Sequence, residues 1–117
     1  MVQYLLYSSP MREQHHTDPT DIDLPTLMTA FTDPVRLQII GILDRQGETP
    51  CAAIYQEIGI SKSGASHHFR VLRETGILLS RKLGRDSYAS LRSSEMEAAF
   101  PGVLDTVLRK IRRRNGA

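Results

Sequence analysis

Cysteine is almost absent from this sequence. Its 117 residues include only Cys51, so no disulfide can form within one chain, and the disulfide frameworks of small secreted domains are excluded. The first residues, "MVQYLLYSSP", lack the basic start of a signal peptide, and no apolar run is long enough to cross a membrane. We therefore expect a cytoplasmic protein with no membrane partner.

Signatures of catalysis are missing as well. None of the patterns G-x-x-x-x-G-K-[ST], H-E-x-x-H and G-x-S-x-G occurs, so we expect no enzymatic activity and no cofactor. What is present is ordinary globular composition, with 40% apolar and 24% charged residues in a chain long enough for one modest core. These features predict a single folded domain.

Charge is unevenly spread along the chain. Residues 1–50 carry three Lys/Arg and seven Asp/Glu, a net charge of −4, whereas residues 51–117 carry twelve and six, a net charge of +6. Between Ser61 and Arg92, seven basic residues accompany two acidic ones, a local charge of +5. Such an excess is typical of a surface that binds a polyanion, although many charge asymmetries are only solvated faces. The basic half is where nucleic acid would bind.

Capping residues and helical spacing divide the first sixty residues. Residues 1–21 are rich in Pro, Asp and Thr, which predicts a flexible N-terminal arm before a domain over residues 22–117. Helices are predicted from Asp23, from Pro34 after the cap Asp33, and from Pro50 after Thr49, with stops at Gly47 and Gly59. The apolar positions at helical spacing are Leu24, Leu27, Met28 and Phe31, then Val35, Ile39, Ile40 and Leu43, then Ala53, Ile54 and Ile58.

The stretch "SKSGASHHFRVLRETGIL", residues 61–78, predicts a fourth helix capped by Ser61. At 100° per residue, Ala65, Phe69 and Leu72 share one face, whereas Ser63, His67 and Arg70 lie opposite with Ser66 on the flank. His68 falls at the edge of the apolar face, where we expect it to pack or to bond a neighbouring backbone group. Adjacent helical positions do not face each other, so the two histidines cannot chelate one metal.

The segments around this helix predict a winged helix-turn-helix, a mainly α fold with a small β-hairpin wing. "YQEIGISKSG" joins two helices by a short turn, although such turns also join helices with no DNA role. "ILLSRKLGRDSYASLR" then predicts a basic hairpin that turns between Leu83 and Asp86. Its half-buried ladder is expected to contain Ile77, Leu79, Tyr88 and Leu91.

Three segments resemble the ArsR (arsenic-repressor) type of small bacterial winged-helix regulators, over about residues 24 to 113. They are "AFTDPVRLQIIGIL", "IGISKSGASHHFRVLRETGIL" and "SRKLGRDSYASL". The resemblance implies a homodimeric repressor that leaves its double-stranded DNA operator when an effector binds. It implies base-groove contacts from Lys62, Ser63, Ser66 and His67, and phosphate contacts from Arg81, Lys82 and Arg85. The position of Arg70 on the polar face also favours a phosphate contact.

The C-terminal segment "SSEMEAAFPGVLDTVLRKIRRRNG" carries more apolar surface than an exposed tail. It begins with a predicted capping box at Ser94 and Glu97, is interrupted at Pro101, and continues with apolar residues at helical spacing. This face can pack on its own domain or, as the resemblance favours, dimerise with a second chain through the N- and C-terminal helices. The residues expected at that interface are Leu24, Leu27, Met28, Phe31, Val103, Leu104, Val107, Leu108 and Ile111.

The sequence does not identify the effector. The metal sites that the resemblance implies are not matched, because Pro50 and Ala52 occupy the thiolate positions and no histidine follows Glu95. We therefore expect no metal. His15, His16 and Asp18 in the arm could bind one, although a flexible pair of histidines is more often an ordinary part of the surface. A small organic ligand, oxidation of Cys51 and the absence of any effector are the remaining alternatives. A winged helix can also serve as a protein-interaction module.

Overall fold

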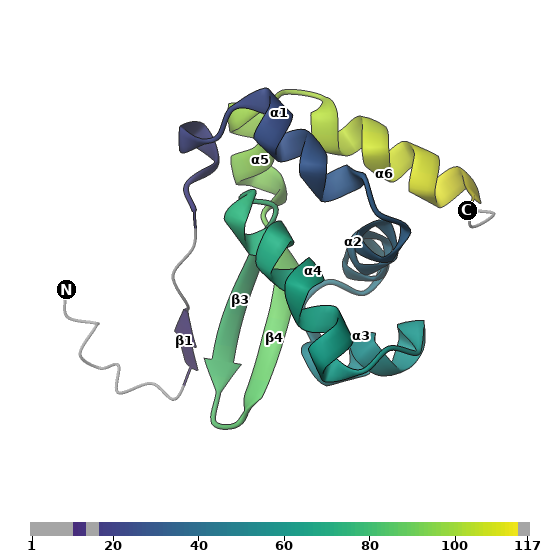
Figure 1. The fold of residues 1–117 in the computed structure, drawn as a ribbon. Coiled ribbons are helices and arrows are strands. Elements are labelled where there is room, and N and C mark those ends of the chain that lie inside the picture. The colour runs from purple at the N-terminus through teal and green to yellow at the C-terminus, as the bar shows by residue number, and fades with distance from the viewer. Residues whose placement is uncertain (1–10, 14–16, 115–117) are drawn as a thin grey trace.

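A computed structural model describes residues 11–13 and 17–114 and places a four-stranded sheet against a helical bundle (Figure 1). The mainly α fold with a β-hairpin wing is confirmed. No helix in these ranges is long and apolar enough to cross a membrane. The strands are β1 (Met11–Glu13), β2 (Thr49–Pro50), β3 (Leu78–Leu83) and β4 (Asp86–Leu91). The helices are α1 (Leu24–Met28), α2 (Pro34–Gln46), α3 (Cys51–Ile58), α4 (Lys62–Glu74), α5 (Ser93–Ala99) and α6 (Val103–Arg114), with 3-10 turns η2 (Pro19–Asp21) and η3 (Thr29–Phe31).

The second helix begins and ends as predicted, but the third begins differently. Asp33 caps α2 by accepting a 2.7 Å hydrogen bond from the Val35 N–H, and α2 ends at Gly47, which has a φ of 74°. Thr49 does not cap α3, because it lies in β2 opposite Ala89 of β4, and α3 has no side-chain cap. Ile54 is buried as expected, but the expectation that Ala53 faces inward was wrong: Ala53 is exposed, and Cys51 shares the buried face with Ile54.

Helices α3 and α4 form the predicted helix-turn-helix. Gly59 ends α3 in the left-handed conformation, at a φ of 84°, which a side chain would disfavour. The Ser61 hydroxyl then accepts a 2.9 Å hydrogen bond from the Gly64 N–H and caps α4. Ala65, Phe69 and Leu72 are buried as predicted, so the opposite face of α4 is turned to solvent.

The hairpin forms, but the four residues of the predicted ladder do not share one face: Ile77 is buried and Leu91 packs against the core, as expected, whereas Leu79 and Tyr88 do not reach the core face. Leu78 and Ser80 of β3 and Ala89 of β4 are buried, whereas Leu79 and Tyr88 lie half-buried on the other face. Side chains alternate along a strand, so the first strand residue decides which face reaches the core. Apolar residues at both 78 and 79 left that choice ambiguous in the sequence.

Parts of the segment predicted as a flexible arm pack on the domain. Residues 11–13 pair antiparallel with β3, and η2 contributes the buried Pro19. Arg92 donates to the Thr17 carbonyl at 2.8 Å, which ties this segment to the start of α5. The boundary at residue 21 stays a prediction. His15 and His16 lie outside the described residues.

The last two helices, α5 and α6, form, but α5 begins without the predicted cap. The predicted Ser94–Glu97 capping box was wrong, because α5 starts at Ser93 with no side-chain cap. Glu97 instead accepts a 3.1 Å hydrogen bond from the Gly102 N–H, just ahead of α6. Helix α6 packs on α2, where a Cβ added at Gly41 would meet Ile111 Cγ2 at 3.0 Å. Glycine at this position therefore permits the close approach of the two helices.

Candidate nucleic-acid interface

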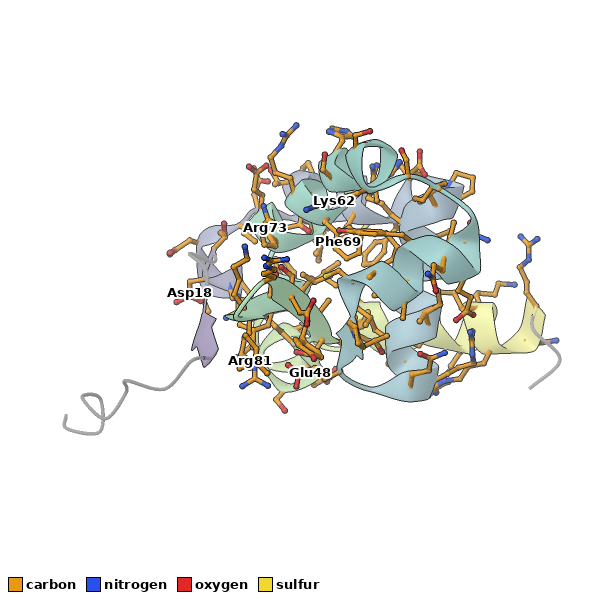
Figure 2. The ribbon with its side chains drawn as sticks, turned by 90° about the horizontal axis from the view of Figure 1, so that it is seen from below. Asp18, Glu48, Lys62, Phe69, Arg73 and Arg81 are labelled. Carbon is orange, nitrogen blue, oxygen red and sulfur yellow. The ribbon has the colours of Figure 1, made fainter. Side chains whose placement is uncertain are left out.

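The N-terminal half of α4 presents one exposed row of polar side chains, which we name the α4 stripe. The fold holds this row outward because Phe69 and its neighbours anchor the other face of α4 in the core (Figure 2). The stripe lies directly after the turn of the helix-turn-helix, where the free backbone N–H groups of a helix start favour an anion. Its members, all exposed, are Lys62, Ser63, Ser66, His67 and Arg70, as predicted.

Hydrogen bonds within the α4 stripe set which groups are free to bind. The Ser66 hydroxyl donates to the Ser63 carbonyl at 3.1 Å, which leaves its oxygen lone pairs outward. Arg70 Nη2 lies 3.1 Å from His67 Nδ1. A guanidinium has only donors, so Nδ1 must accept, and the neutral ring then carries its proton on Nε2. His67 therefore presents a hydrogen-bond donor to whatever lies against the stripe.

The wing carries three basic residues, and they are not equivalent. Lys82 and Arg85 are exposed near the tip, and no ion pair engages either within the described part of the chain. Arg81 instead donates to Glu48 Oε2, with Nε at 3.0 Å and Nη2 at 2.6 Å (Figure 2). The predicted phosphate contact of Arg81 therefore competes with a carboxylate of its own chain.

His68 is half-buried, in keeping with the packing that was one of two expectations, and its ring meets a buried arginine and not a backbone group. Arg36, with 7% of its surface exposed, has Nη1 at 3.0 Å from His68 Nδ1 and donates through Nη2 to the Thr29 carbonyl at 2.9 Å and the Thr32 hydroxyl at 3.2 Å. Asp33 lies 3.9 Å from the same histidine nitrogen. We name these five residues the Arg36 cluster.

Sequence reasoning missed the Arg36 cluster. Its only local signal was a charged residue on the apolar face of α2, four and seven positions before Ile40 and Leu43. Within the cluster, the Val35 N–H that bonds Asp33 lowers the pKa of that carboxyl, with a smaller effect from His68. The cluster connects η3 and α2 to α4, so it helps to hold the α4 stripe in place.

Cys51 is poorly suited to sense oxidants. Its side chain is buried at the start of α3, and burial raises the pKa of the thiol to about 11. The thiolate is the reactive form, so a raised pKa opposes oxidation near neutral pH. Within residues 17–114 no three His, Cys, Asp or Glu side chains gather in a way that would hold a metal.

The residues predicted at a dimer interface divide into two groups. Leu27, Leu104 and Leu108 lie in the core of their own chain, so packing on their own domain accounts for them. Leu24 is 50% exposed and Met28 is 36% exposed, whereas Phe31, Val103, Val107 and Ile111 are half-buried. Helices α1 and α6 lie on the side of the molecule away from the wing tip (Figure 1).

An open groove of about 960 Å³ lies where η3, α2, α3 and α6 meet. Its volume is in the range of pockets that take small organic molecules. Its apolar lining comes from Phe31, Leu37, Ile42, Ile58 and Ile111, and its charged lining from Asp33, Arg45, Glu57 and Arg114.

Known proteins are similar in sequence to about two thirds of the chain. Residues 31–81 match a family described as a helix-turn-helix domain. An uncharacterized HTH-type transcriptional regulator, YceK of Bacillus subtilis (strain 168), is 38% identical over 82 residues, which cover 69% of this chain and 82% of that protein. A transcriptional repressor SmtB homolog of Synechocystis sp. is 31% identical over 77 residues, which cover 66% of this chain and 58% of that protein.

Solved structures share the fold. HlyU from Vibrio cholerae N16961 superposes with a TM-score of 0.63 at 24% identity, covering 80% of this chain and 91% of that one. The crystal structure of an ArsR family transcriptional regulator superposes with a TM-score of 0.59 at 18% identity, covering 80% and 91%. The arrangement of the helix-turn-helix and the hairpin is therefore common to these chains.

Proposed function

The chain belongs to the ArsR-type family of winged helix-turn-helix transcriptional regulators, and from this premise we propose that it is a homodimeric repressor of a specific DNA operator. The observation that carries the proposal is the α4 stripe, exposed at the start of the second helix of the motif. In helix-turn-helix proteins this helix start enters the major groove and meets base edges. Such a regulator acts in the cytoplasm, where its DNA lies.

The stripe supports a division of labour between base reading and phosphate binding. Short hydroxyls at Ser63 and Ser66 let the helix approach the bases closely, and the Nε2 donor of His67 suits an acceptor such as guanine O6 or N7. Lys62 would face the groove with them. Arg70, with Lys82 and Arg85 of the wing, would bind phosphates and fix the position of the protein on the duplex.

Two copies of the chain would bind two half-sites roughly 34 Å apart. The exposed apolar side chains of α1 and the half-buried ones of α6 support a two-fold contact, since an unpartnered apolar patch is costly in water. We propose Leu24, Met28, Phe31, Val103, Val107 and Ile111 for that contact.

The proposed effector is a small organic molecule and not a metal. The groove is lined by Phe31 and Ile111, which also belong to the proposed dimer contact, so a ligand there would change how the two copies meet. Oxidation of Cys51 is less well supported, because the thiolate is scarce at neutral pH.

Binding to genomic fragments selected by the protein tests the proposal. If six to eight phosphates are neutralised per dimer, log affinity should fall with log salt with a slope of about −5 to −7. Sedimentation of the complex should give two chains per operator. Weak binding with a slope near zero and no sequence preference would overturn the proposal and favour a protein-interaction module.

A further inference from the structure

The Arg81–Glu48 pair spans three strands of the sheet. Glu48 directly precedes β2, whose Pro50 is opposite Tyr88 of β4, and Tyr88 is opposite Arg81 of β3. Both donors of Arg81 converge on one oxygen, Glu48 Oε2, and each side chain is one-third exposed, at 33%. The pair therefore lies at the surface of the wing, on the face of the sheet opposite the buried Ser80 and Ala89.

We propose that Glu48 competes with DNA phosphate for Arg81 and thereby lowers the affinity of the wing for DNA of any sequence. This inference rests on the proposed function. A phosphate that binds the Nε–Nη2 edge of Arg81 must displace the carboxylate, and the carboxylate left beside it then repels the phosphates. The α4 stripe, which would read the bases, has no part in the pair, so the effect should not depend on sequence.

The contrast with the rest of the wing supports this role. Lys82 and Arg85 have no ion-pair partner among the described residues, so they are available to phosphate without any exchange. The Nε–Nη2 edge of Arg81 offers two parallel donors, a geometry that suits a phosphate, and both already bind the carboxylate. Glu48 thus holds back one of the two arginines of the wing and leaves Arg85 and Lys82 free.

Replacing Glu48→Gln removes the charge and keeps the shape of the side chain. Exposed ion pairs are weak, so we expect affinity for operator and for unrelated DNA to rise alike, by about 3- to 10-fold. The salt slope should become steeper by about 1 per chain, because one more arginine reaches phosphate. Fluorescence anisotropy with both duplexes over a salt series measures these quantities.

Asp44→Asn is the matched control. Asp44 pairs with Arg112 of α6 at 2.7 and 2.8 Å, so the variant loses the same single charge from an equally close arginine pair. That pair joins α2 to α6, away from the wing. We expect less than about 2-fold tighter binding in this variant, since only the general charge effect remains.

A second measurement tests the inference through variants of Arg81. Because Arg81 is already engaged, Arg81→Ala should weaken binding less than Lys82→Ala, and Glu48→Gln should give no gain once Arg81 is alanine. Equal gains from Glu48→Gln and Asp44→Asn, or a full gain without Arg81, would overturn the inference alone. Absence of any DNA binding by the unaltered protein would instead overturn the proposed function.

Discussion

His67 and His68 are consecutive residues with opposite surroundings. Each ring has its Nδ1 next to an arginine, but His67 meets the exposed Arg70 of its own helix, whereas His68 meets the buried Arg36 of α2. A single 100° step around α4 therefore separates the surface that can touch a ligand from the contact that holds the helix. Changes in the Arg36 cluster should therefore affect the stability of the fold first, whereas changes in the α4 stripe should affect only DNA binding.

The Arg36 cluster links α2 to η3 and to α4 through hydrogen bonds. Arg36 joins residues of η3 to a residue of α4 that is 32 positions away in sequence. Its buried Nε has no hydrogen-bond partner among the described residues, so only the bonds of its two terminal nitrogens offset the cost of burying the charge. A buried charge held this way favours one arrangement of its partners over others.

Removal of Arg36 should have the largest effect. Arg36→Ala leaves His68 Nδ1 and the Thr29 carbonyl without their donor, and we expect a loss of about 2 to 4 kcal/mol in the free energy of unfolding. Arg36→Lys should lose less, because a lysine can satisfy some but not all of these acceptors. Urea denaturation followed by circular dichroism measures both. If Arg36→Ala unfolds like the unaltered protein, the cluster does not stabilise the fold.

His67→Ala should leave stability within about 0.5 kcal/mol, since exposed side chains contribute little to folding. Its effect should fall on DNA, with a loss of about 1 to 3 kcal/mol in the preference for operator over unrelated sequence, and Ser66→Ala should act in the same direction. Competition binding with the two duplexes measures this preference.

The matched control for His67→Ala is His68→Asn, which keeps an acceptor near the position of Nδ1 and should retain the operator preference. An unchanged preference in His67→Ala, or its loss in His68→Asn alone, would reverse the roles that we assign to the two histidines.

Local signals in the sequence were sufficient for the stripe and the helix-turn-helix. The Ser61 cap, the Gly47 and Gly59 stops and the apolar face of α4 each depend on residues within one or two turns, and all three were confirmed. The same locality explains why Ser63, Ser66, His67 and Arg70 could be named from helical spacing, whereas Lys62 was implied by the family resemblance.

Contacts between distant residues were not predictable in this way. The bonds Arg36–His68 and Arg81–Glu48 join residues 32 and 33 positions apart, and no periodicity records such pairs. Thr49 likewise resembles a helix cap in sequence, but in the structure its backbone pairs with Ala89 of β4. These misses share one cause, which is that the tertiary arrangement decides between two locally reasonable roles.

The smallest effect is expected at Cys51, on the inner side of the helix-turn-helix. With a pKa raised to about 11, roughly one thiol in ten thousand is ionised at neutral pH, so iodoacetamide should modify the folded protein about 100-fold more slowly than the unfolded protein. Peroxide or diamide should change operator affinity by less than about 2-fold. Mass spectrometry with and without urea gives the labelling rates, and rapid labelling in urea is the internal control. Fast oxidation of the folded chain with a matching loss of operator binding would show that burial does not protect the Cys51 thiol. Oxidation of Cys51 would then be the signal, in place of the proposed organic effector.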